Sequence, residues 1–426
     1  MLHRFFGSSV GARGVASRIY IDLTDIVEHV LWHATGAGIQ RVQLELAVAL
    51  VRSHPNVVPF SLYGNIWRDL RGDIEEAGGD NERLQLRLRG HFPYPGARPS
   101  LLRPRHTARL LKARLFALRD RLTLRPPWLN AGDTLFVGGQ FWMSQTIIKL
   151  CRRAAAQNAN LIVVIHDLIP ITHPQFTGHD FVDEYRQVLR LPAHFIVTTS
   201  FSAGELEATR KNLGAPPAAV SVIPLAHEFP GSPRNATPLG PPRELKDLAG
   251  CAFVLCVGTV EVRKNHLLLL SVWGELEAEL GERLPKLVIA GRRGWKAQAV
   301  LRKLDAPPRG IVFAEAPNDE ALGWLYSACL FTIFPSLLEG WGLPVGESLW
   351  FGKSCAASDA SPIPAVGGDL CVYFDPHEPA AIKAAVRRLL DPDIRRSFEK
   401  KIKAAKLRTW AEVVSDIERI LAPPPH

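Results

Sequence analysis

Two glutamates eight residues apart flank a glycine-rich turn in the stretch Phe334–Glu347 (FPSLLEGWGLPVGE). The stretch follows an apolar run typical of a buried strand and leads into a helix-like segment, so Glu339 is expected in a loop and Glu347 about one turn into a helix. Glycines let backbone N–H groups approach a ligand, and the positive end of a helix favours an anion such as a diphosphate. The spacing therefore predicts a site that holds different parts of one elongated ligand. The alternative is a turn with two surface acids.

Two further groups of polar residues follow apolar, strand-like runs. Arg263 and Lys264 are adjacent, and two neighbouring cations suit the charge that develops on a leaving phosphate, although an Arg-Lys pair is often only solvated. His166 comes directly after a buried run, and such positions face the ligand cleft of a parallel sheet. A lone histidine there is more often structural. Asp167 beside it is expected to cap or orient rather than react.

Short apolar, β-branched runs alternate with helix-period segments along the chain. Strands that are apolar on both faces, with helices between them, indicate parallel sheets that are covered on both sides. The predicted strands are Ile19–Leu23, Leu135–Val137, Leu161–Ile165 and Phe195–Thr199 in the first half, and Phe253–Val257, Lys286–Ala290, Gly310–Phe313 and Leu330–Phe334 in the second.

A segment dense in Pro and Gly, residues 229–246, divides the 426-residue chain into two halves. We predict an α/β protein with an N-terminal Rossmann-like domain over residues 1–228, including a basic insertion at about 70–128. A second domain is expected over residues 247–405, followed by a C-terminal helix and tail over 406–426. Two such domains leave a cleft between the carboxyl ends of their strands, where sheets of this kind bind ligands.

The chain carries 51 Lys and Arg against 42 Asp and Glu, a formal net charge of +9, and 47% hydrophobic residues, which excludes wholesale disorder. Much of the excess lies in Leu101–Trp128, where leucines recur at helical spacing between basic residues. This pattern is typical of an amphipathic helix that lies on an anionic membrane surface, and equally of a surface helix packed on its own domain. No nucleic-acid recognition module accompanies the basic residues, so we expect no nucleic-acid partner.

The six cysteines are isolated among apolar neighbours, which favours reduced, buried thiols over disulfides or a zinc site. The N-terminus lacks a signal-peptide core, and no apolar run reaches the length of a membrane span. We therefore expect a cytoplasmic protein, with peripheral contact at the inner face of the plasma membrane as an open alternative. Asp391-Pro392-Asp393 is expected to form a turn rather than a metal site.

Taken together, these segments resemble the retaining GT-B glycosyltransferases of family GT4. The Glu-x7-Glu arrangement looks like that family's donor-site motif, and Val257–His266 (VGTVEVRKNH) resembles its VGTxExRKN turn. Three further segments fall in the family's order: Leu287–Trp295, Asp319–Tyr326 and Ser358–Gly368. In the first half, Thr35–Arg41 and Ile165–Pro170 are similar to the loops that face the family's donor cleft. The likeness is most specific to bacterial polysaccharide mannosyltransferases.

The resemblance implies a GT-B fold, with two Rossmann-like domains whose parallel sheets face an interdomain cleft. It also implies a metal-independent hexosyltransferase of cell-surface polysaccharide synthesis that needs no cofactor. The expected donor is a nucleotide-diphosphate sugar, with GDP-mannose favoured, and the expected acceptor is a glycan or a lipid-linked saccharide. Alternatives are a GT-B nucleotide-sugar epimerase and a catalytically degenerate, membrane-associated scaffold of a polysaccharide-synthesis complex.

Residue roles follow from the same resemblance. His166, Glu339 and Lys264 are the expected catalytic residues: His166 and Glu339 would contact the transferred sugar. Arg263 and Lys264 would bind the diphosphate and stabilise it as it leaves.

Glu347 would accept hydrogen bonds from the ribose, and Gly342 and Leu343 would offer backbone amides. Gly38, at the start of the first long helix, is also expected to meet the donor. Arg41 would meet phosphate or acceptor there, or lie on a solvated face.

Overall fold

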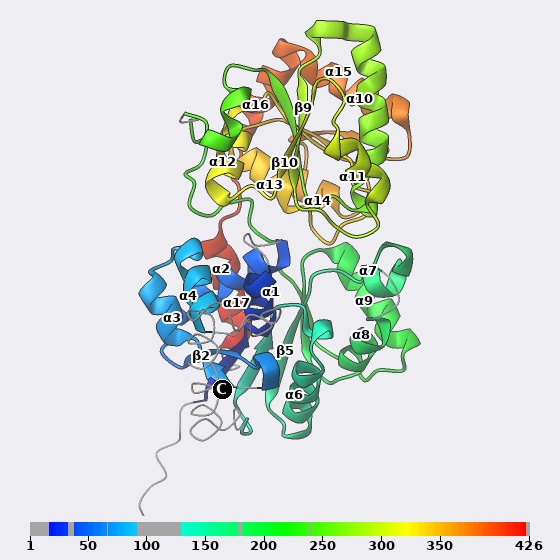
Figure 1. Ribbon diagram of the computed structural model, residues 1–426. Coiled ribbons are helices and arrows are strands. Elements are labelled where there is room, and N and C mark those ends of the chain that lie inside the picture. The colour runs from blue at the N-terminus through cyan, green and yellow to red at the C-terminus, as the bar shows by residue number, and fades with distance from the viewer. Residues whose placement is uncertain are drawn as a thin grey trace, which may run out of the picture.

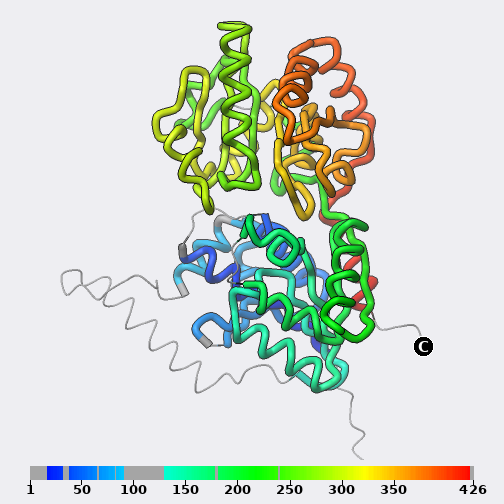
Figure 2. The backbone as a smooth tube through the Cα atoms, turned by 90° about the vertical axis from the view of Figure 1, so that its right-hand side faces the viewer, coloured from blue at the N-terminus to red at the C-terminus, as the bar shows by residue number. Residues whose placement is uncertain are grey.

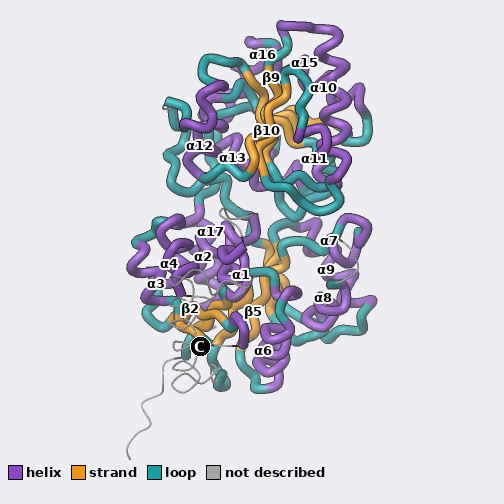
Figure 3. The backbone as a smooth tube through the Cα atoms, in the orientation of Figure 1, coloured by secondary structure: helices purple, strands orange, loops and turns teal. Residues whose placement is uncertain are grey.

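The computed structural model describes residues 17–32, 38–65, 67–91, 129–177, 181–237 and 240–422. They form two α/β domains joined by a narrow waist, and Figure 1 shows one domain above the other. Figure 3 shows that each domain is a sheet with helices on both faces. This is the layered arrangement expected for parallel strands that are buried on both sides.

The first domain is built on a seven-stranded sheet with the order β3-β2-β1-β4-β5-β6-β7, in which β3 alone is antiparallel to its neighbour. Its strands are β1 Ile19–Asp22, β2 Val57–Ser61, β3 Arg68–Asp69, β4 Thr134–Val137, β5 Asn160–Ile165, β6 His194–Val197 and β7 Val220–Val222. Its helices are α1 Thr24–Trp32, α2 Gly38–Ser53, α3 Arg71–Ala77, α4 Asn81–His91, α6 Gln145–Ala156, α7 Ile169–Thr172, α8 Val182–Leu189 and α9 Ser200–Asn212.

The second domain is built on a six-stranded, fully parallel sheet with the order β10-β9-β8-β11-β12-β13. Counted along the domain, this is the 3-2-1-4-5-6 order of a Rossmann fold, which binds ligands at the point where the strand order reverses. Its strands are β8 Phe253–Val257, β9 Lys286–Gly291, β10 Ile311–Glu315, β11 Thr332–Phe334, β12 Cys355–Ser358 and β13 Cys371–Phe374. Its helices are α10 His266–Leu280, α11 Gln298–Asp305, α12 Asp319–Ala328, α13 Leu343–Trp350, α14 Ile363–Gly367, α15 Pro379–Leu390 and α16 Pro392–Ala404.

All eight predicted strands are confirmed, with ends shifted by two residues or fewer. Five strands are additional to the prediction. The run of β2 contains Pro59, and that of β12 (CAAS) is small and weakly β-forming, so neither gives a strong sequence signal. Asp391, expected in a turn, caps α16 by accepting hydrogen bonds from the backbone N–H groups of Asp393 and Ile394.

The last helix, α17 (Trp410–Leu421), packs on the first domain although it follows the second in sequence. Figures 1 and 2 both show its red segment beside the first domain. Trp410, Val413 and Ile417 are buried, and a capping box joins Thr409 with Glu412 at its N-terminus. The chain therefore crosses between the domains twice.

The predicted basic insertion divides into two parts. Residues 71–91 form α3 and α4, which contribute the buried side chains of Ile74, Leu84 and Leu88 to the core of the first domain. The amphipathic segment Leu101–Trp128 lies outside the described residues. None of the described helices is long and apolar enough to cross a membrane.

Candidate functional site

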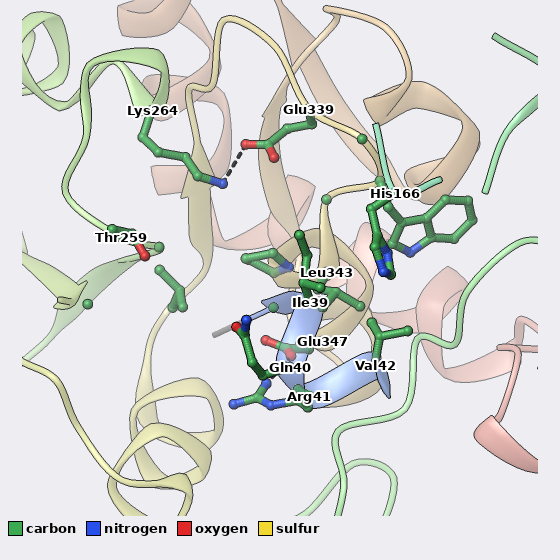
Figure 4. Close-up of a pocket in the computed structure, with 18 of the residues that line it drawn as sticks. Ile39, Gln40, Arg41, Val42, His166, Thr259, Lys264, Glu339, Leu343 and Glu347 are labelled. Atoms are coloured by element: carbon green, nitrogen blue, oxygen red, sulfur yellow. Dashed lines mark hydrogen bonds and ion pairs between the residues drawn. The ribbon is translucent and has the colours of Figure 1, made fainter. Parts of the chain in front are cut away.

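A cleft with a volume of about 440 Å³ lies between the two domains. The carboxyl ends of seven strands supply much of its lining, as expected for two Rossmann-like sheets that face each other. The first domain contributes residues that follow β4, β5 and β6, and the second contributes residues that follow β8, β9, β10 and β11. The cleft therefore contains the candidate residues of both halves (Figure 4).

His166 directly follows β5 and is buried in the wall of the cleft. Its Nε2 lies 2.7 Å from the carbonyl oxygen of Gly138. Because a carbonyl only accepts, Nε2 carries the proton and donates, which leaves the lone pair on Nδ1. Burial lowers the pKa of His166, so the ring is neutral at physiological pH and can position a ligand hydroxyl without carrying charge.

Asp167 also lines the cleft, and its Oδ1 accepts a hydrogen bond of 3.0 Å from the backbone N–H of Ile169. Burial raises the pKa of Asp167, and the nearby Arg263 guanidinium opposes that shift. The carboxylate thus holds the first turn of α7, as the orienting role predicts.

Arg263 forms an ionic cluster with the buried side chains of Lys264 and Glu339 in the second domain. Lys264 Nζ lies 2.5 Å from Glu339 Oε1, and Arg263 Nη1 lies 2.7 Å from Glu339 Oε2. Burial alone would raise the pKa of Glu339, but the two cations outweigh it and lower the pKa to about 2. Arg263 also bonds Glu261 at 2.8 Å, so two cations and two carboxylates balance here.

The cluster is held together by backbone as well as side-chain contacts. The N–H of Leu337 donates to the carbonyl oxygen of Arg263 over 2.8 Å, which joins the turn after β8 to the loop after β11. Burial lowers the pKa of the Lys264 ammonium, and the charge of Glu339 opposes that shift. Arg and Lys carry five and three N–H donors, so both retain donors for a phosphate while they hold Glu339.

The loop after Glu339 ends at Gly342, which precedes the first turn of α13 with φ of +106°, a left-handed conformation that favours glycine. Leu343 and Pro344 open the helix and line the cleft, so the positive end of α13 faces the ligand space. Gly38, the first residue of α2, lies opposite: a Cβ placed on it would be 3.5 Å from the Leu343 side chain. Two helix N-termini therefore meet in the cleft.

Glu347 lies on the first two turns of α13 and is buried. Its Oε2 accepts a hydrogen bond of 2.7 Å from the hydroxyl of Tyr326, and its Oε1 lies 2.5 Å from Arg41 Nη1. Arg41 therefore does not lie on a solvated face. Its side chain spans the cleft and pairs with Glu347 of the second domain, so a phosphate would not be its only partner.

The loop after β11 also docks on the first domain at Gly340. A Cβ there would lie 2.2 Å from the carbonyl oxygen of His166 and 2.9 Å from the Cβ of Asp167. The hydroxyl of Thr198 donates to the carbonyl oxygen of Gly340 over 2.9 Å. Only a residue without a side chain permits this approach, which places His166 beside the loop that carries Glu339.

Sequence reasoning assigned no role to Tyr326, Asp319, Thr198 or Gly340. Asp319 and Tyr326 are seven residues apart on α12, a spacing that places both on one face of the helix. This spacing was the sequence feature that could have indicated a shared role. Thr198 and Gly340 meet only through the docking of the domains, which the sequence does not show. Among the described residues, no group of three or more His, Cys, Asp or Glu side chains is arranged to hold a metal ion.

The chain resembles known proteins in sequence. Residues 247–406 match the family model described as glycosyl transferases group 1. O-antigen chain mannosyltransferase B of Escherichia coli is 29% identical over 238 residues, which are 54% of this chain and 61% of that protein. Serotype-specific mannosyltransferase WbdA of Escherichia coli is 28% identical over 163 residues, which are 38% of this chain and 20% of that protein. The chain therefore spans about three fifths of the first relative and one fifth of the second.

Solved structures show the same fold at low sequence identity. Sucrose-phosphate synthase from Thermosynechococcus elongatus superposes with a TM-score of 0.62 at 15% identity, covering 95% of this chain and 98% of that one. The α,α-trehalose-phosphate synthase (UDP-forming) from Burkholderia vietnamiensis gives a TM-score of 0.61 at 12% identity, with coverages of 95% and 99%. Both are GT-B proteins, which confirms the predicted fold. The chain has the GT-B fold, and its second domain is similar, over residues 247–406, to the glycosyl transferases group 1 family.

Proposed function

We propose that this protein is a retaining hexosyltransferase that moves mannose from GDP-mannose to a glycan or lipid-linked saccharide during cell-surface polysaccharide synthesis. The observation that carries the proposal is the cluster of Arg263, Lys264 and Glu339 on the cleft wall, with two helix N-termini nearby. Cations and helix ends of this kind stabilise a diphosphate as negative charge develops on it. The mannosyltransferase names of the sequence relatives support the choice of mannose.

In the proposed reaction the bond from the anomeric carbon to the diphosphate oxygen breaks while the acceptor oxygen forms its bond on the same face. The acceptor proton passes to the departing phosphate oxygen, so no residue has to form a covalent sugar adduct. Arg263 and Lys264 stabilise the leaving diphosphate, and Glu339 and neutral His166 orient the sugar. The two cations supply the charge that a metal would otherwise provide, so we propose that transfer proceeds without one.

We further propose that the protein acts in the cytoplasm and that Leu101–Trp128 holds it at the inner face of the plasma membrane, close to a lipid-linked acceptor. Deleting this segment should weaken binding to anionic liposomes while donor binding is kept. Unchanged liposome binding would mean that the basic residues of this segment are only solvated.

Calorimetric titration with GDP-mannose, GDP-fucose, dTDP-rhamnose and UDP-hexoses in the presence of EDTA tests the donor. We expect the tightest binding for GDP-mannose, unchanged by removal of EDTA. If product analysis finds a free epimerised donor, the protein is an epimerase instead. Absence of binding to every nucleotide sugar would indicate a degenerate scaffold.

A further inference from the structure

Arg41 belongs to the first domain, but its guanidinium group lies against the second. Nη1 is 2.5 Å from Glu347 Oε1 on α13, and Nη2 is 3.0 Å from Asp319 Oδ1 at the start of α12. Figure 4 shows Arg41 reaching from α2 to lie next to Glu347. One side chain therefore joins α2 to two helices of the other domain.

This contact is largely shielded from water. The side chains of Arg41 and Glu347 are 15% and 5% exposed, whereas that of Asp319 is 43% exposed. The Arg41 guanidinium also lies 5.0 Å from the centre of the Phe229 ring, a cation–π distance. Burial alone would lower the pKa of Arg41, but Glu347 and Asp319 outweigh it and raise the pKa above its ordinary value.

The same contact fixes the orientation of Glu347. Arg41 holds one carboxylate oxygen and the Tyr326 hydroxyl holds the other, so the group is restrained from both sides. Each carboxylate oxygen has two lone pairs, so both can still accept a hydrogen bond from a ribose hydroxyl. Glu347 and Arg41 both line the cleft, so a ribose bound there could reach the Glu347 carboxylate.

Opening the cleft would separate Arg41 from Glu347 and break their ion pair, whereas replacing Arg41 in the closed arrangement would leave the Glu347 charge buried without its cation. Removing one partner of a buried ion pair is strongly unfavourable because the other charge remains uncompensated. A ligand that binds better to the closed arrangement shifts the protein toward it.

We propose that Arg41 is a positioning residue that couples domain closure to nucleotide binding: the ribose-binding carboxylate is restrained at both oxygens only while α2 is docked on α12 and α13. This inference rests on the proposed function, because it assumes that Glu347 binds the ribose of the donor. It adds that the first domain takes part in nucleotide binding through a residue that need not touch the nucleotide.

The test measures GDP binding by calorimetry for wild type and for Arg41→Met, Arg41→Lys and Asp319→Asn. Arg41→Met should weaken GDP binding at least about tenfold. Arg41→Lys should be intermediate, because an ammonium cannot reproduce the bidentate geometry of a guanidinium. Asp319→Asn should change binding less than about threefold, since Asp319 is the more exposed partner. Arg52→Met, an exposed position at the other end of α2, is the matched control and should bind as wild type.

Amide hydrogen exchange separates coupling between the domains from a local effect on Glu347, because a local effect would not change the exchange rate at the start of α2. In wild type, GDP should slow exchange in α13 and also at the start of α2. In Arg41→Met at saturating GDP, only the slowing in α13 should remain. The inference is overturned if Arg41→Met binds GDP as tightly as wild type, or if α2 is protected equally in both. Wild type that binds neither GDP nor UDP would refute the proposed function itself, and this inference with it.

Discussion

Glu339 accepts hydrogen bonds from both cations of the site, so each of the three side chains holds the others in position. Removing any one of them takes an ion-pair partner from a buried charge, and it also removes a group that is expected to act on the donor. Single-residue changes in this cluster should therefore affect turnover strongly.

Glu339→Ala and Lys264→Ala should each reduce the rate of sugar transfer at least about tenfold, equivalent to roughly 1.4 kcal/mol of activation free energy. Steady-state kinetics with GDP-mannose measure the change. Glu282→Ala, which removes an exposed partner of Arg309, is the control and should transfer sugar as wild type does. Wild-type turnover in both cluster variants would contradict the site assignment.

His266, the first residue of α10, is only 1% exposed, and burial together with the Lys264 charge lowers its pKa to about 3. The unfolded chain therefore takes up a proton near pH 6.5, whereas the folded protein does not until about pH 3. The unfolding free energy should fall as the pH falls through this window, by up to about 1.4 kcal/mol per pH unit from this group.

Denaturant unfolding of His266→Gln between pH 6.5 and 5 checks this expectation, because the free energy should depend less on pH than in wild type. The exposed His377 provides the control, and His377→Gln should keep the wild-type slope. An unchanged slope in His266→Gln would mean that another buried group carries the pH dependence.

At the scale of elements, the ends of strands and the N-termini of helices position the side chains of the site. The sequence predicted these ends. Lys264 and Glu339 follow strands that are recognisable from apolar runs, and parallel strands that end at one edge bring such residues together. The partners of Arg41 could not be predicted in this way. Glu347 is 306 residues away, and which side chains meet across a cleft depends on how two separately folded sheets dock.

The loop after β11 must approach the first domain closely at Gly340, which makes this position sensitive to any side chain. Gly340→Ala would place its Cβ 2.2 Å from the His166 carbonyl oxygen, so the loop and β5 must separate. We expect at least about a tenfold loss of transfer, measured by the same kinetics, with a far-ultraviolet circular dichroism spectrum like that of wild type.

Gly274→Ala is the matched control for this substitution. Gly274 lies within α10, and a Cβ there would meet no atom within 4 Å. Alanine favours a helix interior by about 1 kcal/mol over glycine, so stability should hold or rise and activity should persist. If the two alanine variants were equally active, close docking at Gly340 would not be needed for transfer.

At the scale of the whole molecule, the chain crosses between its domains in the connection from β7 to β8 and returns between α16 and α17. The helix-like pattern near the C-terminus predicts a helix within residues 406–426, and α17 confirms it. The pattern could not show that this helix packs on the first domain, because an apolar face specifies burial but not its partner. The two crossings, the Arg41 ion pairs and the Gly340 contact together hold the cleft in the arrangement described.

In the proposed reaction, this cleft transfers a sugar from a nucleotide donor with retention at the anomeric carbon. Proton NMR of the reaction with GDP-mannose, a mannose-terminated glycan acceptor and EDTA tests it most directly. We predict a new glycosidic bond whose anomeric signal has the α configuration of the donor, formed together with GDP. A β-linked product, a free epimerised donor, or no consumption of GDP-mannose would rule out this reaction.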